Sequence, residues 1–379
     1  MKHRLRLFTS FVLLSLAPLP FAQAEAQTEP TQPSSSRKAA EAIGSLRNAR
    51  VAVEMPNEKK PLTYFAGSIP ADDLATLQRI APNLTIVSGL SQEEALARAE
   101  EAHGIDARFA KTAFLKKASN LRWVQVQSAG VDRYLQIQPL MENDALVLSN
   151  FRGIHGPSIA DHSMAMLLSL TRNLNHYGAN QREGKWSKSS PPTNSVALDG
   201  KTMLVVGLGG IGTQIAQRAN GFGMRVIGTR RSDSPSPDYI DKVGKPNELL
   251  SLLPEADVVA LAVPLTSETE NLLDAEAFAA MKEGSYLINI ARGKVVNTEA
   301  LMQALESGKL AGACLDVTDP EPLTKGHPLW KLPNVIITPH VAGRSAVTNQ
   351  RRSALTVENL RRFAAGEPLL NVVDKEAGY

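Results

Sequence analysis

Short apolar runs alternate with longer segments of helical spacing from residue 50 to the end of the chain. The first apolar runs of strand length are residues 51–53, 84–87, 123–126 and 146–148. Between them, residues 71–80 and 92–103 carry apolar side chains at the spacing of a helix face. Strands that alternate with helices are typical of layered α/β proteins, so the pattern predicts this fold class.

The spacing changes at residue 158. Ser158 is followed three positions later by Asp161, a pair that resembles a capping box and predicts a helix that starts here. The helix expected over residues 159–174 is long and strongly apolar. Residues 184–194 are rich in Gly, Ser, Pro and Asn, and they predict an exposed arm or linker before a second block of strands.

The second block opens with a glycine-rich turn between a strand and a helix. The buried run at 202–206 leads into GLGGIG at residues 207–212, which precedes a helical pattern at 213–222 and a strand at 224–228. In such a unit the backbone can approach a pyrophosphate, which the free N–H groups of the helix N-terminus then bind. An ordinary glycine-rich turn is the alternative. The residues expected to form this dinucleotide site are Gly207, Gly209, Gly210, Ile211 and Gly212.

The end of the next strand predicts which dinucleotide is bound. An NAD site normally has an Asp or Glu about 20 residues after the glycines, where it accepts hydrogen bonds from the ribose hydroxyls. This chain has Thr229, Arg230 and Arg231 there. Guanidinium groups suit a 2′-phosphate, through bidentate charge-assisted hydrogen bonds. We therefore expect NADP rather than NAD; a solvated basic loop, or a shift of register that brings in Asp233, is the alternative.

Four more buried runs end in polar residues. They cover residues 257–263, 285–290, 311–317 and 335–338. Ligands of open α/β sheets bind just past the carboxyl ends of the strands. Three side chains that follow these runs are therefore expected to meet at the edge that also carries the glycine loop, and they are Arg292, Glu321 and His340. Taken one by one, they also fit a surface ion pair, a turn residue and a strand-end cap.

Charge and cysteine content exclude several classes of protein. The chain has 379 residues, with 41 Lys and Arg, 38 Asp and Glu, and one cysteine. The excess of basic residues lies before residue 7, and a neutral remainder argues against a nucleic-acid-binding protein. A single cysteine excludes an intramolecular disulfide and a cysteine-based zinc site. Because the histidines lack ligand spacing, no metal is expected.

The first residues have the pattern of a secretory signal peptide. Lys2, Arg4 and Arg6 precede a short apolar run, which is followed by the small-x-small sequence AQA at residues 22–24. The pattern predicts a signal peptide at 1–24 and a flexible linker at 25–48. We expect an exported protein, periplasmic or secreted, with no membrane segment in its mature form, since the apolar run is too short to span a bilayer. The alternatives are a mitochondrial presequence, a later start codon, or a cytoplasmic protein with an inefficient signal.

Residues 120–345 closely resemble the D-isomer-specific 2-hydroxyacid dehydrogenases, and most of all their glyoxylate/hydroxypyruvate reductase branch. The motifs that carry the resemblance are SAGVD (128–132), ADH (160–162), the glycine loop, VPLT (263–266), NIARG (289–293), DV and EP (316–317 and 321–322) and TPH (338–340). Asp161 departs from the family, which usually has Glu there.

The resemblance implies two doubly wound parallel-sheet domains that pair into a homodimer through the nucleotide-binding domains. The Rossmann dinucleotide-binding domain is expected at residues 156–345. The flavodoxin-like substrate domain is expected to combine residues 49–155 with the returning segment 346–379.

The resemblance also assigns catalytic roles. Arg292 would hold the carboxylate and carbonyl of a 2-oxo acid, because its planar fork suits paired oxygens. His340 would be the general acid/base, and Glu321 would hydrogen-bond and orient it. The substrate carboxylate would be bound by backbone N–H groups of one loop, at Ala129, Gly130 and Val131.

The remaining implied contacts are to the cofactor. Asp316 would contact the nicotinamide amide. The other residues implied at the cofactor are Val263, Pro264, Thr269, Ile290, Ala291, His340 and Gly343. The expected activity is D-stereospecific hydride transfer between NADP(H) and a small 2-oxo or 2-hydroxy acid of the glyoxylate or hydroxypyruvate type. The alternative is an exported protein that binds such a ligand or a dinucleotide but has lost turnover.

Overall fold

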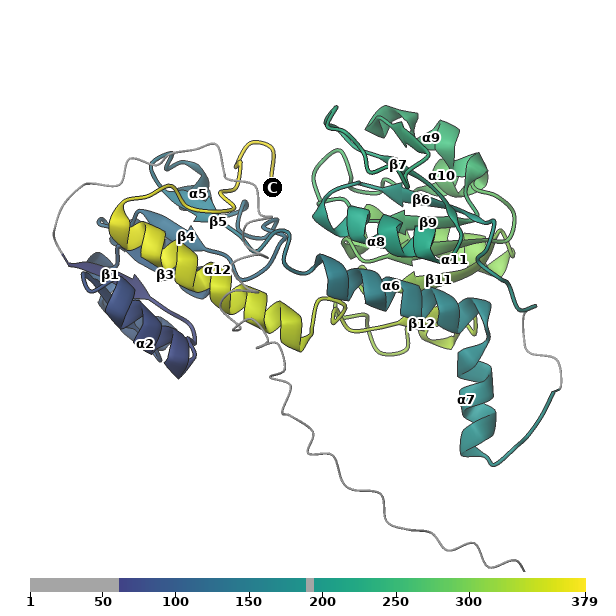
Figure 1. The fold of residues 1–379 in the computed structure, drawn as a ribbon, viewed down its shortest axis with the longest axis horizontal. Coiled ribbons are helices and arrows are strands. Elements are labelled where there is room, and N and C mark those ends of the chain that lie inside the picture. Colours follow the sequence, from purple (N-terminus) through teal and green to yellow (C-terminus); the bar gives the residue numbers. More distant parts are fainter. Residues whose placement is uncertain (1–60, 189–193) are drawn as a thin grey trace, which may run out of the picture. The chain divides into compact units, whose positions relative to one another are not determined.

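The computed structural model describes residues 61–188 and 194–379. The predicted signal peptide, linker and first strand (51–53) therefore lie outside the described residues, as does part of the predicted arm at 184–194. In the described part of the chain no helix is long and apolar enough to cross a membrane. Two parallel β-sheets with helices on both faces confirm the predicted α/β class (Figure 1).

The first sheet has five parallel strands among the described residues, in the order β2-β1-β3-β4-β5. Their bounds are β1 (Leu62–Phe65), β2 (Leu84–Val87), β3 (Gly104–Asp106), β4 (Trp123–Gln125) and β5 (Val147–Ser149). This order is flavodoxin-like, as expected. The runs predicted at 84–87, 123–126 and 146–148 form β2, β4 and β5, whereas the short strands β1 and β3 are missing from the sequence prediction.

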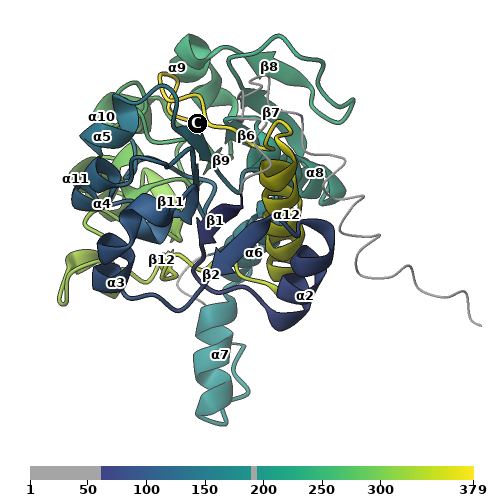
Figure 2. The same ribbon diagram turned by 90° about the vertical axis from the view of Figure 1, so that its left-hand side faces the viewer.

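Apolar side chains alternate between the two faces of this sheet, because successive residues of a strand point to opposite sides. Phe65 and Val124 belong to the core on one face, and Tyr64 and Trp123 belong to the core on the other. The covering helices are α3 (Gln92–Ala97), α4 (Thr112–Lys117) and α5 (Gln138–Met141) on the first face, and α2 (Ala71–Ile80) and α12 (Ala346–Ala365) on the second. Figure 2 shows α2 and α12 side by side.

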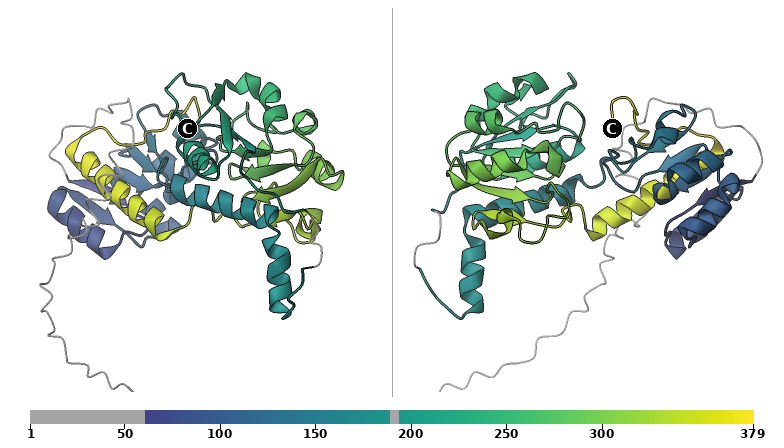
Figure 3. Two further views of the ribbon diagram at one scale, coloured as in Figure 1. Left: turned by 45° about the vertical axis from the view of Figure 1, so that its right-hand side comes forward. Right: turned by 180° about the vertical axis from the view of Figure 1, so that it is seen from behind.

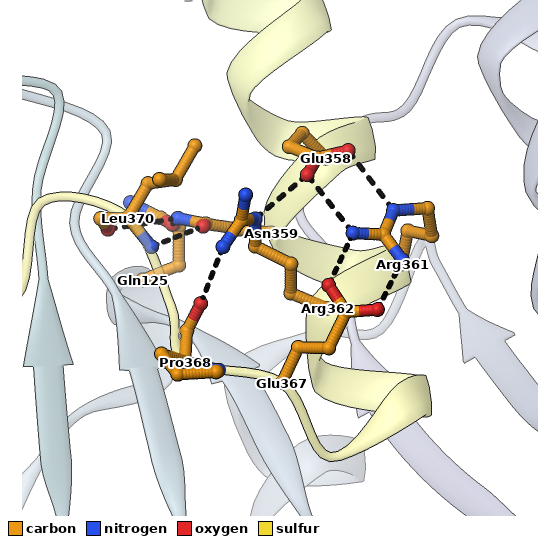
Figure 4. Close-up of polar contacts among 8 residues, drawn as sticks. All are labelled: Gln125, Glu358, Asn359, Arg361, Arg362, Glu367, Pro368 and Leu370. Carbon is orange, nitrogen blue, oxygen red and sulfur yellow. Dashed lines mark hydrogen bonds and ion pairs between the residues drawn. The ribbon is translucent and has the colours of Figure 1, made fainter. Parts of the chain in front are cut away.

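The last helix and the segment after it return to the five-stranded sheet. Asn359 of α12 is fully buried, and its Nδ2 donates to Gln125 Oε1 (3.0 Å) and to the Leu370 carbonyl (3.2 Å) (Figure 4). Its Oδ1 accepts from the N–H of Leu370 at 2.8 Å. Val373 N then donates to the carbonyl of Leu148 in β5 (2.8 Å). These bonds hold the C-terminal segment against β4 and β5.

The second sheet has seven parallel strands within the described ranges, in the order β12-β11-β10-β9-β6-β7-β8. Their bounds are β6 (Thr202–Val206), β7 (Arg225–Thr229), β8 (Lys242–Gly244), β9 (Val258–Leu261), β10 (Ser285–Asn289), β11 (Leu310–Leu315) and β12 (Val335–Ile337). From the β8 edge this is the Rossmann order with one further strand, so the expected Rossmann fold is confirmed.

Helices cover both faces of the seven-stranded sheet (Figure 3). They are α6 (Gly156–Thr171) and α8 (Gly210–Gly221) on one face, and α9 (Leu249–Leu252), α10 (Ala275–Ala280) and α11 (Thr298–Glu306) on the other. The strands between them are almost entirely buried. Asp161 of α6 pairs with Arg218 of α8 at 2.5 Å, so the shorter acid at this position still reaches a cation.

The predicted capping box at Ser158 is wrong. α6 begins at Gly156 with Pro157 in its first turn, because proline is well suited to the start of a helix. Ser158 therefore lies inside the helix, where its hydroxyl is hydrogen-bonded to the hydroxyls of Ser345 (2.7 Å) and Thr348 (3.0 Å).

The single helix predicted over 159–174 is also wrong. α6 ends at Thr171, and a second helix, α7 (Leu174–Arg182), follows after Asn173. Asn173 has φ 54°, a left-handed conformation that interrupts the helical path. No residue of α7 is buried, and Leu174 and Tyr177 are exposed on it.

Candidate active site

The glycine loop joins β6 to α8 at the carboxyl edge of the seven-stranded sheet. Gly207 has φ 98°, and a Cβ there would lie 2.8 Å from the Ala262 carbonyl oxygen. A Cβ on Gly212 would lie 2.0 Å from the carbonyl oxygen of Gly207, whereas Gly209 has open space at that position. The N–H groups of residues 210–212 donate no hydrogen bond within the described residues. A close backbone approach beside free N–H groups at a helix N-terminus fits a dinucleotide pyrophosphate.

Thr229, at the end of β7, supports this loop. It is buried, its hydroxyl accepts from Gly207 N (3.3 Å), and its carbonyl accepts from Leu208 N (2.8 Å). Its side chain therefore stabilises the turn on which the glycine residues lie. Arg230, the next residue, donates from Nε to the Ser232 carbonyl (3.1 Å) and from Nη2 to Ser236 Oγ (3.0 Å), so the following loop holds its guanidinium.

The cations at this edge outnumber the carboxylates. The Arg231 guanidinium lies 4.3 Å from the centre of the Tyr379 ring. Lys245 Nζ donates to the Arg231 carbonyl (3.1 Å) and forms an ion pair with the exposed Asp233. Asp233, the acid considered as a possible ribose ligand, is thus paired with a lysine here, and this edge keeps a positive excess that fits a phosphate group.

The loop after β4, residues 128–132, presents free backbone donors. Asn150 Nδ2 donates to the Ala129 carbonyl (2.8 Å), and Ser128 Oγ donates to the Gly130 carbonyl (2.8 Å). The N–H groups of Ala129, Gly130 and Val131 donate no hydrogen bond within the described ranges. Successive backbone N–H groups of this kind bind anions, so the loop fits the carboxylate that it is predicted to bind.

Arg292 lies directly against this loop. A Cβ on Gly130 would lie 1.6 Å from Arg292 Nη2, so only glycine leaves room for the guanidinium. Nε and Nη2 of Arg292 are each 3.1 Å from Asp132 Oδ1, and Nη1 donates to the Ala291 carbonyl at 2.7 Å. Buried Asn289 donates to the Arg292 carbonyl (3.0 Å) and fixes the turn after β10. The structure thus brings together the predicted substrate loop and the predicted substrate arginine.

His340 and Glu321 also meet. His340 Nδ1 lies 2.8 Å from Glu321 Oε1, and both side chains are partly exposed. A carboxylate can only accept, so the proton in this bond belongs to Nδ1, and Nε2 is left to exchange a proton with a ligand. His340 has φ 54°, a costly conformation for a residue with a side chain, of the kind that clusters at functional sites.

Asp316 holds the strained backbone of His340 in place. The carboxylate is buried and accepts from Thr338 Oγ1 (2.6 Å), Val341 N (2.9 Å) and Ala342 N (3.0 Å). Its own carbonyl accepts from His340 N at 2.9 Å. In this structure Asp316 therefore anchors the loop that carries His340, and its contact with a nicotinamide amide stays a prediction.

The other predicted cofactor residues line the same edge. Val263 Cγ1 lies 2.8 Å from the Cβ position of Gly207, and Thr269 Oγ1 donates to the Pro264 carbonyl (2.6 Å) and closes that turn. Ile290 and Ala291 are buried between Asn289 and Arg292.

Gly343 packs against the ring of His155, which was not singled out in the sequence. The Cβ position of Gly343 lies 3.1 Å from His155 Cδ2. His155 Nδ1 is buried and has no hydrogen-bond partner in the described chain. Burial, with Arg352 nearby, lowers the pKa of His155 to about 4, so this ring is neutral at physiological pH.

Sequence reasoning named Asp132 only as part of a motif and did not single out Asn150, Asn289 or Thr338. Each of them supports a predicted site residue by a hydrogen bond. The signal available in the sequence was the motifs themselves, because Asp132, Asn289 and Thr338 belong to SAGVD, NIARG and TPH; Asn150 lies outside them. In residues 61–188 and 194–379 no three His, Cys, Asp or Glu side chains gather as metal ligands.

A Rossmann sheet whose carboxyl edge combines a glycine-rich dinucleotide loop with an arginine and a hydrogen-bonded His–Glu pair fits a nicotinamide-dependent oxidoreductase. The sequence model "D-isomer specific 2-hydroxyacid dehydrogenase, NAD binding domain" matches residues 164–342. The chain belongs to the D-isomer specific 2-hydroxyacid dehydrogenase family, and the resemblance to its glyoxylate/hydroxypyruvate reductase branch is confirmed.

Relatives and a solved structure give this assignment its detail. Glyoxylate/hydroxypyruvate reductase B of Klebsiella pneumoniae is 34% identical over 338 residues, which are 84% of this chain and 99% of the relative. Glyoxylate reductase of Korarchaeum cryptofilum is 36% identical over 264 residues, 68% of this chain and 78% of the relative. A D-isomer specific 2-hydroxyacid dehydrogenase of Xanthobacter autotrophicus, solved with NADPH and MES, is 30% identical with a TM-score of 0.70, over 84% of this chain and 100% of that chain.

Proposed function

We propose that the protein is an NADP(H)-preferring reductase of small 2-oxo acids of the glyoxylate and hydroxypyruvate type, with D-2-hydroxy acids as products. The observation that carries the proposal is the contact of Arg292 with Gly130, in the loop whose N–H groups are free. This contact combines a guanidinium fork with backbone donors, the combination that a carboxylate next to a carbonyl requires.

The chain's own residues divide the work of the reaction. Arg292 and the N–H groups of residues 129–131 bind and orient the 2-oxo acid, while Asp132 keeps the guanidinium in place. Glu321 fixes the His340 ring through Nδ1, and Nε2 donates the proton to the oxygen of the forming alcohol. A reduced nicotinamide, when bound, supplies the hydride.

The cofactor would be held along the carboxyl edge of the seven-stranded sheet. The glycine loop and the N-terminus of α8 would bind its pyrophosphate. Arg230 and Arg231, on the supporting turn at Thr229, would bind the 2′-phosphate. The residues at the ends of β9, β10 and β12 would surround the nicotinamide end.

The first experiment follows NADPH and NADH oxidation by the purified, nucleotide-free protein with glyoxylate, hydroxypyruvate and phenylpyruvate. We expect NADPH-selective turnover, and a loss of more than about 100-fold in kcat/KM for Arg292→Ala and for His340→Ala. Lys294→Ala is the matched control, because it removes an exposed cation two residues from Arg292. Full activity in either site variant would contradict the assigned role, and no turnover by a folded wild type would contradict the proposal.

Cofactor preference has its own test. We expect Arg230→Asp to raise the ratio of kcat/KM with NADH to that with NADPH by at least about 10-fold, since it replaces a charge-assisted donor with a repelling carboxylate. Arg225→Gln is the control, because Arg225 begins β7 at the opposite edge and pairs with Glu255. An unchanged ratio in Arg230→Asp would refute the 2′-phosphate argument.

Two further expectations concern the protein in its surroundings. We propose a homodimer, which the exposed helix α7 supports, since it buries none of its own residues within one chain.

We also propose export, on the signal-peptide pattern of residues 1–24 alone. Protein recovered from the periplasm or the medium should have the intact mass of residues 25–379. Protein found in the cytoplasm with the mass of the full 379-residue chain would refute export.

A further inference from the structure

The loops that follow β1 and β3 lie at the topological switch point of the five-stranded sheet. In the order β2-β1-β3-β4-β5 the chain leaves β1 toward α2 on one face, and after β3 it continues to α4 on the other. Two neighbouring strands whose connections diverge in this way leave a crevice at their carboxyl ends, which is where open α/β sheets bind ligands.

A cation lies at this switch point. Arg108 follows β3, and three of its guanidinium atoms lie 2.8–2.9 Å from the position that a Cβ would take on Gly67, two residues past the end of β1. The guanidinium thus lies across the backbone of the β1 loop, and only a glycine there leaves room for it.

The Arg108 guanidinium forms a long ion pair with Asp106, and its N–H donors have no hydrogen-bond acceptor among the described residues. Within the described ranges its guanidinium donates no hydrogen bond, and its nearest carboxylate oxygen, Asp106 Oδ1, is 3.7 Å from Nε. Asp106 is buried, and its Oδ1 accepts from the Arg108 backbone N–H at 2.9 Å.

The charge around Arg108 is positive. Arg352 of α12 lies near Asp106, and its Nη2 is 3.5 Å from Gln127 Oε1. Burial raises the pKa of Asp106, against the opposing effect of Arg108 and Arg352. Whether Asp106 is ionised or protonated, the two arginines leave a positive excess at the carboxyl ends of β3 and β4.

Arg108 lies at the same edge of the five-stranded sheet as the loop 128–132, which is proposed to bind the substrate carboxylate. Asp106 pairs with Gln125 in the sheet register. Arg108 lies in the 3-10 turn 107–109 directly after β3, and Gln127 leads from β4 into the loop 128–132 that carries the free N–H groups. Neighbouring strands are about 5 Å apart. Because the guanidinium lies over the β1 loop and β3 stands between β1 and β4, a ligand whose carboxylate occupies the 129–131 donors has to span about two strand spacings, roughly 10 Å, to reach Arg108.

From this juxtaposition we infer that Arg108 is a specificity residue that binds a second negative group at the far end of the substrate, so that the enzyme accepts dianionic 2-oxo acids. The inference rests on the proposed function, because it assumes that the 129–131 loop binds the substrate carboxylate. It adds that a distal carboxylate gains charge-assisted hydrogen bonds from Arg108 that a distal methyl group cannot make.

The test compares 2-oxoglutarate with 2-oxovalerate, which has the same number of carbons but no distal carboxylate, and with glyoxylate, which has no distal group. For the wild type we expect a higher kcat/KM for 2-oxoglutarate than for 2-oxovalerate. Arg108→Gln should lower kcat/KM for 2-oxoglutarate by about 10- to 100-fold, the range for hydrogen bonds to a charged group. It should change kcat/KM for glyoxylate and for 2-oxovalerate by less than about twofold, because these substrates have no distal group that accepts a hydrogen bond from the guanidinium.

Three further variants make the result specific. Gly67→Ala, whose new Cβ displaces the guanidinium, should reproduce the selective loss without removing the charge. Arg108→Lys should restore part of the activity with 2-oxoglutarate, because it keeps the charge without the fork. Arg122→Gln is the matched control: Arg122 precedes β4 at the amino edge of the same sheet, where it donates to the Leu121 carbonyl.

The outcomes separate this inference from the proposed function. Equal losses for all three substrates in Arg108→Gln, or no preference for 2-oxoglutarate in the wild type, would overturn the role of Arg108 while glyoxylate turnover still supported the reductase. If no substrate turned over, calorimetric titration of 2-oxoglutarate into the wild type and Arg108→Gln would decide. Binding lost only in the variant supports the anion site, and equal or absent binding overturns it.

Discussion

Gly209 and Gly212 lie three residues apart in one motif, yet their surroundings give them different tasks. The Cβ position of Gly209 faces open space, and that of Gly212 lies 2.0 Å from a backbone oxygen. A side chain at Gly212 would collide with the backbone of the loop on which α8 packs. A side chain at Gly209 would meet no protein atom and would only occupy the space in front of the loop, where a ligand would bind. Two glycines that a motif treats alike can thus be separated by experiment.

We expect Gly209→Ala to leave the melting temperature unchanged and to weaken NADPH binding by at least about 10-fold, because its methyl group occupies the space that the phosphates approach. Gly212→Ala should lower the free energy of unfolding by about 1–3 kcal/mol, as overpacking of a core does. Thermal unfolding and fluorescence titration with NADPH measure both effects.

Gly221→Ala is the matched control for these two variants. It lies at the end of the same helix, and no atom lies within 4 Å of its Cβ position. This variant should keep both stability and cofactor affinity. Wild-type affinity in Gly209→Ala, or wild-type stability in Gly212→Ala, would contradict the division of tasks.

At the scale of elements, α12 makes two kinds of polar contact, one to the sheet and one within the helix and the turn that follows it (Figure 4). Its buried side has the Asn359 amide, which connects Gln125 of β4 to the backbone of Leu370. Its outer side has ion pairs, in which Arg361 donates to Glu358 (3.0 Å) and to Glu367 (2.8 Å). Water can replace the outer contacts but not the buried ones, so the buried amide should contribute more to stability.

Asn359→Ala should lower the free energy of unfolding by about 2–4 kcal/mol, because it leaves the Leu370 N–H and carbonyl buried without partners. Glu367→Gln, which removes one charge from the outer ion pairs, should cost less than about 1 kcal/mol. Urea denaturation of both variants measures the difference. Similar losses in the two would show that burial is not what distinguishes these contacts.

At the scale of the whole molecule, helix α7 has no buried residue in the part of the chain that the structure describes. Leu174 is 53% exposed and Tyr177 is 39% exposed on it. A nine-residue helix that buries none of its residues is stabilised poorly by propensity alone, so we propose a second copy of the chain as the partner of this surface in the proposed homodimer.

We expect light scattering to give twice the mass of one chain for the wild type and the mass of a single chain for the double variant Leu174→Glu, Tyr177→Glu. The charges would have to be desolvated in a dimer interface. Ile80→Glu is the control, because Ile80 has a similar exposure, 40%, on α2. A monomeric wild type, or a dimer in both variants, would contradict the role of α7.

The errors in the sequence prediction have local physical reasons. The helix start is predicted at Ser158 because a serine with an acid three positions later resembles a capping box, whereas in the structure the helix begins at Gly156 with Pro157 in its first turn. The break at Asn173 depends on a left-handed asparagine that no spacing rule signals. Strand β3 (GID) has one apolar residue, Ile105, so no apolar run marks it.

The sequence by itself determined the glycine loop, most of the strands, the fold class and the family, because apolar periodicity and glycine sterics act over a few neighbouring residues. It also predicted that Arg292, Glu321 and His340 follow strands of the same sheet. The resemblance also implied the pairing of Glu321 with His340, but only the tertiary structure decided the partner of Arg292 and the anchor of the His340 loop. Asp132 lies 160 positions from Arg292, and Asp316 holds the strained His340 loop across two strands.

The same holds for the contact of Arg108 with Gly67 and for the amide of Asn359 beside Gln125. These pairs depend on the order of strands in a sheet and on the return of α12, which are set by packing of the whole chain. Local pattern therefore specified which residues are available for chemistry, and the fold specified which of them meet.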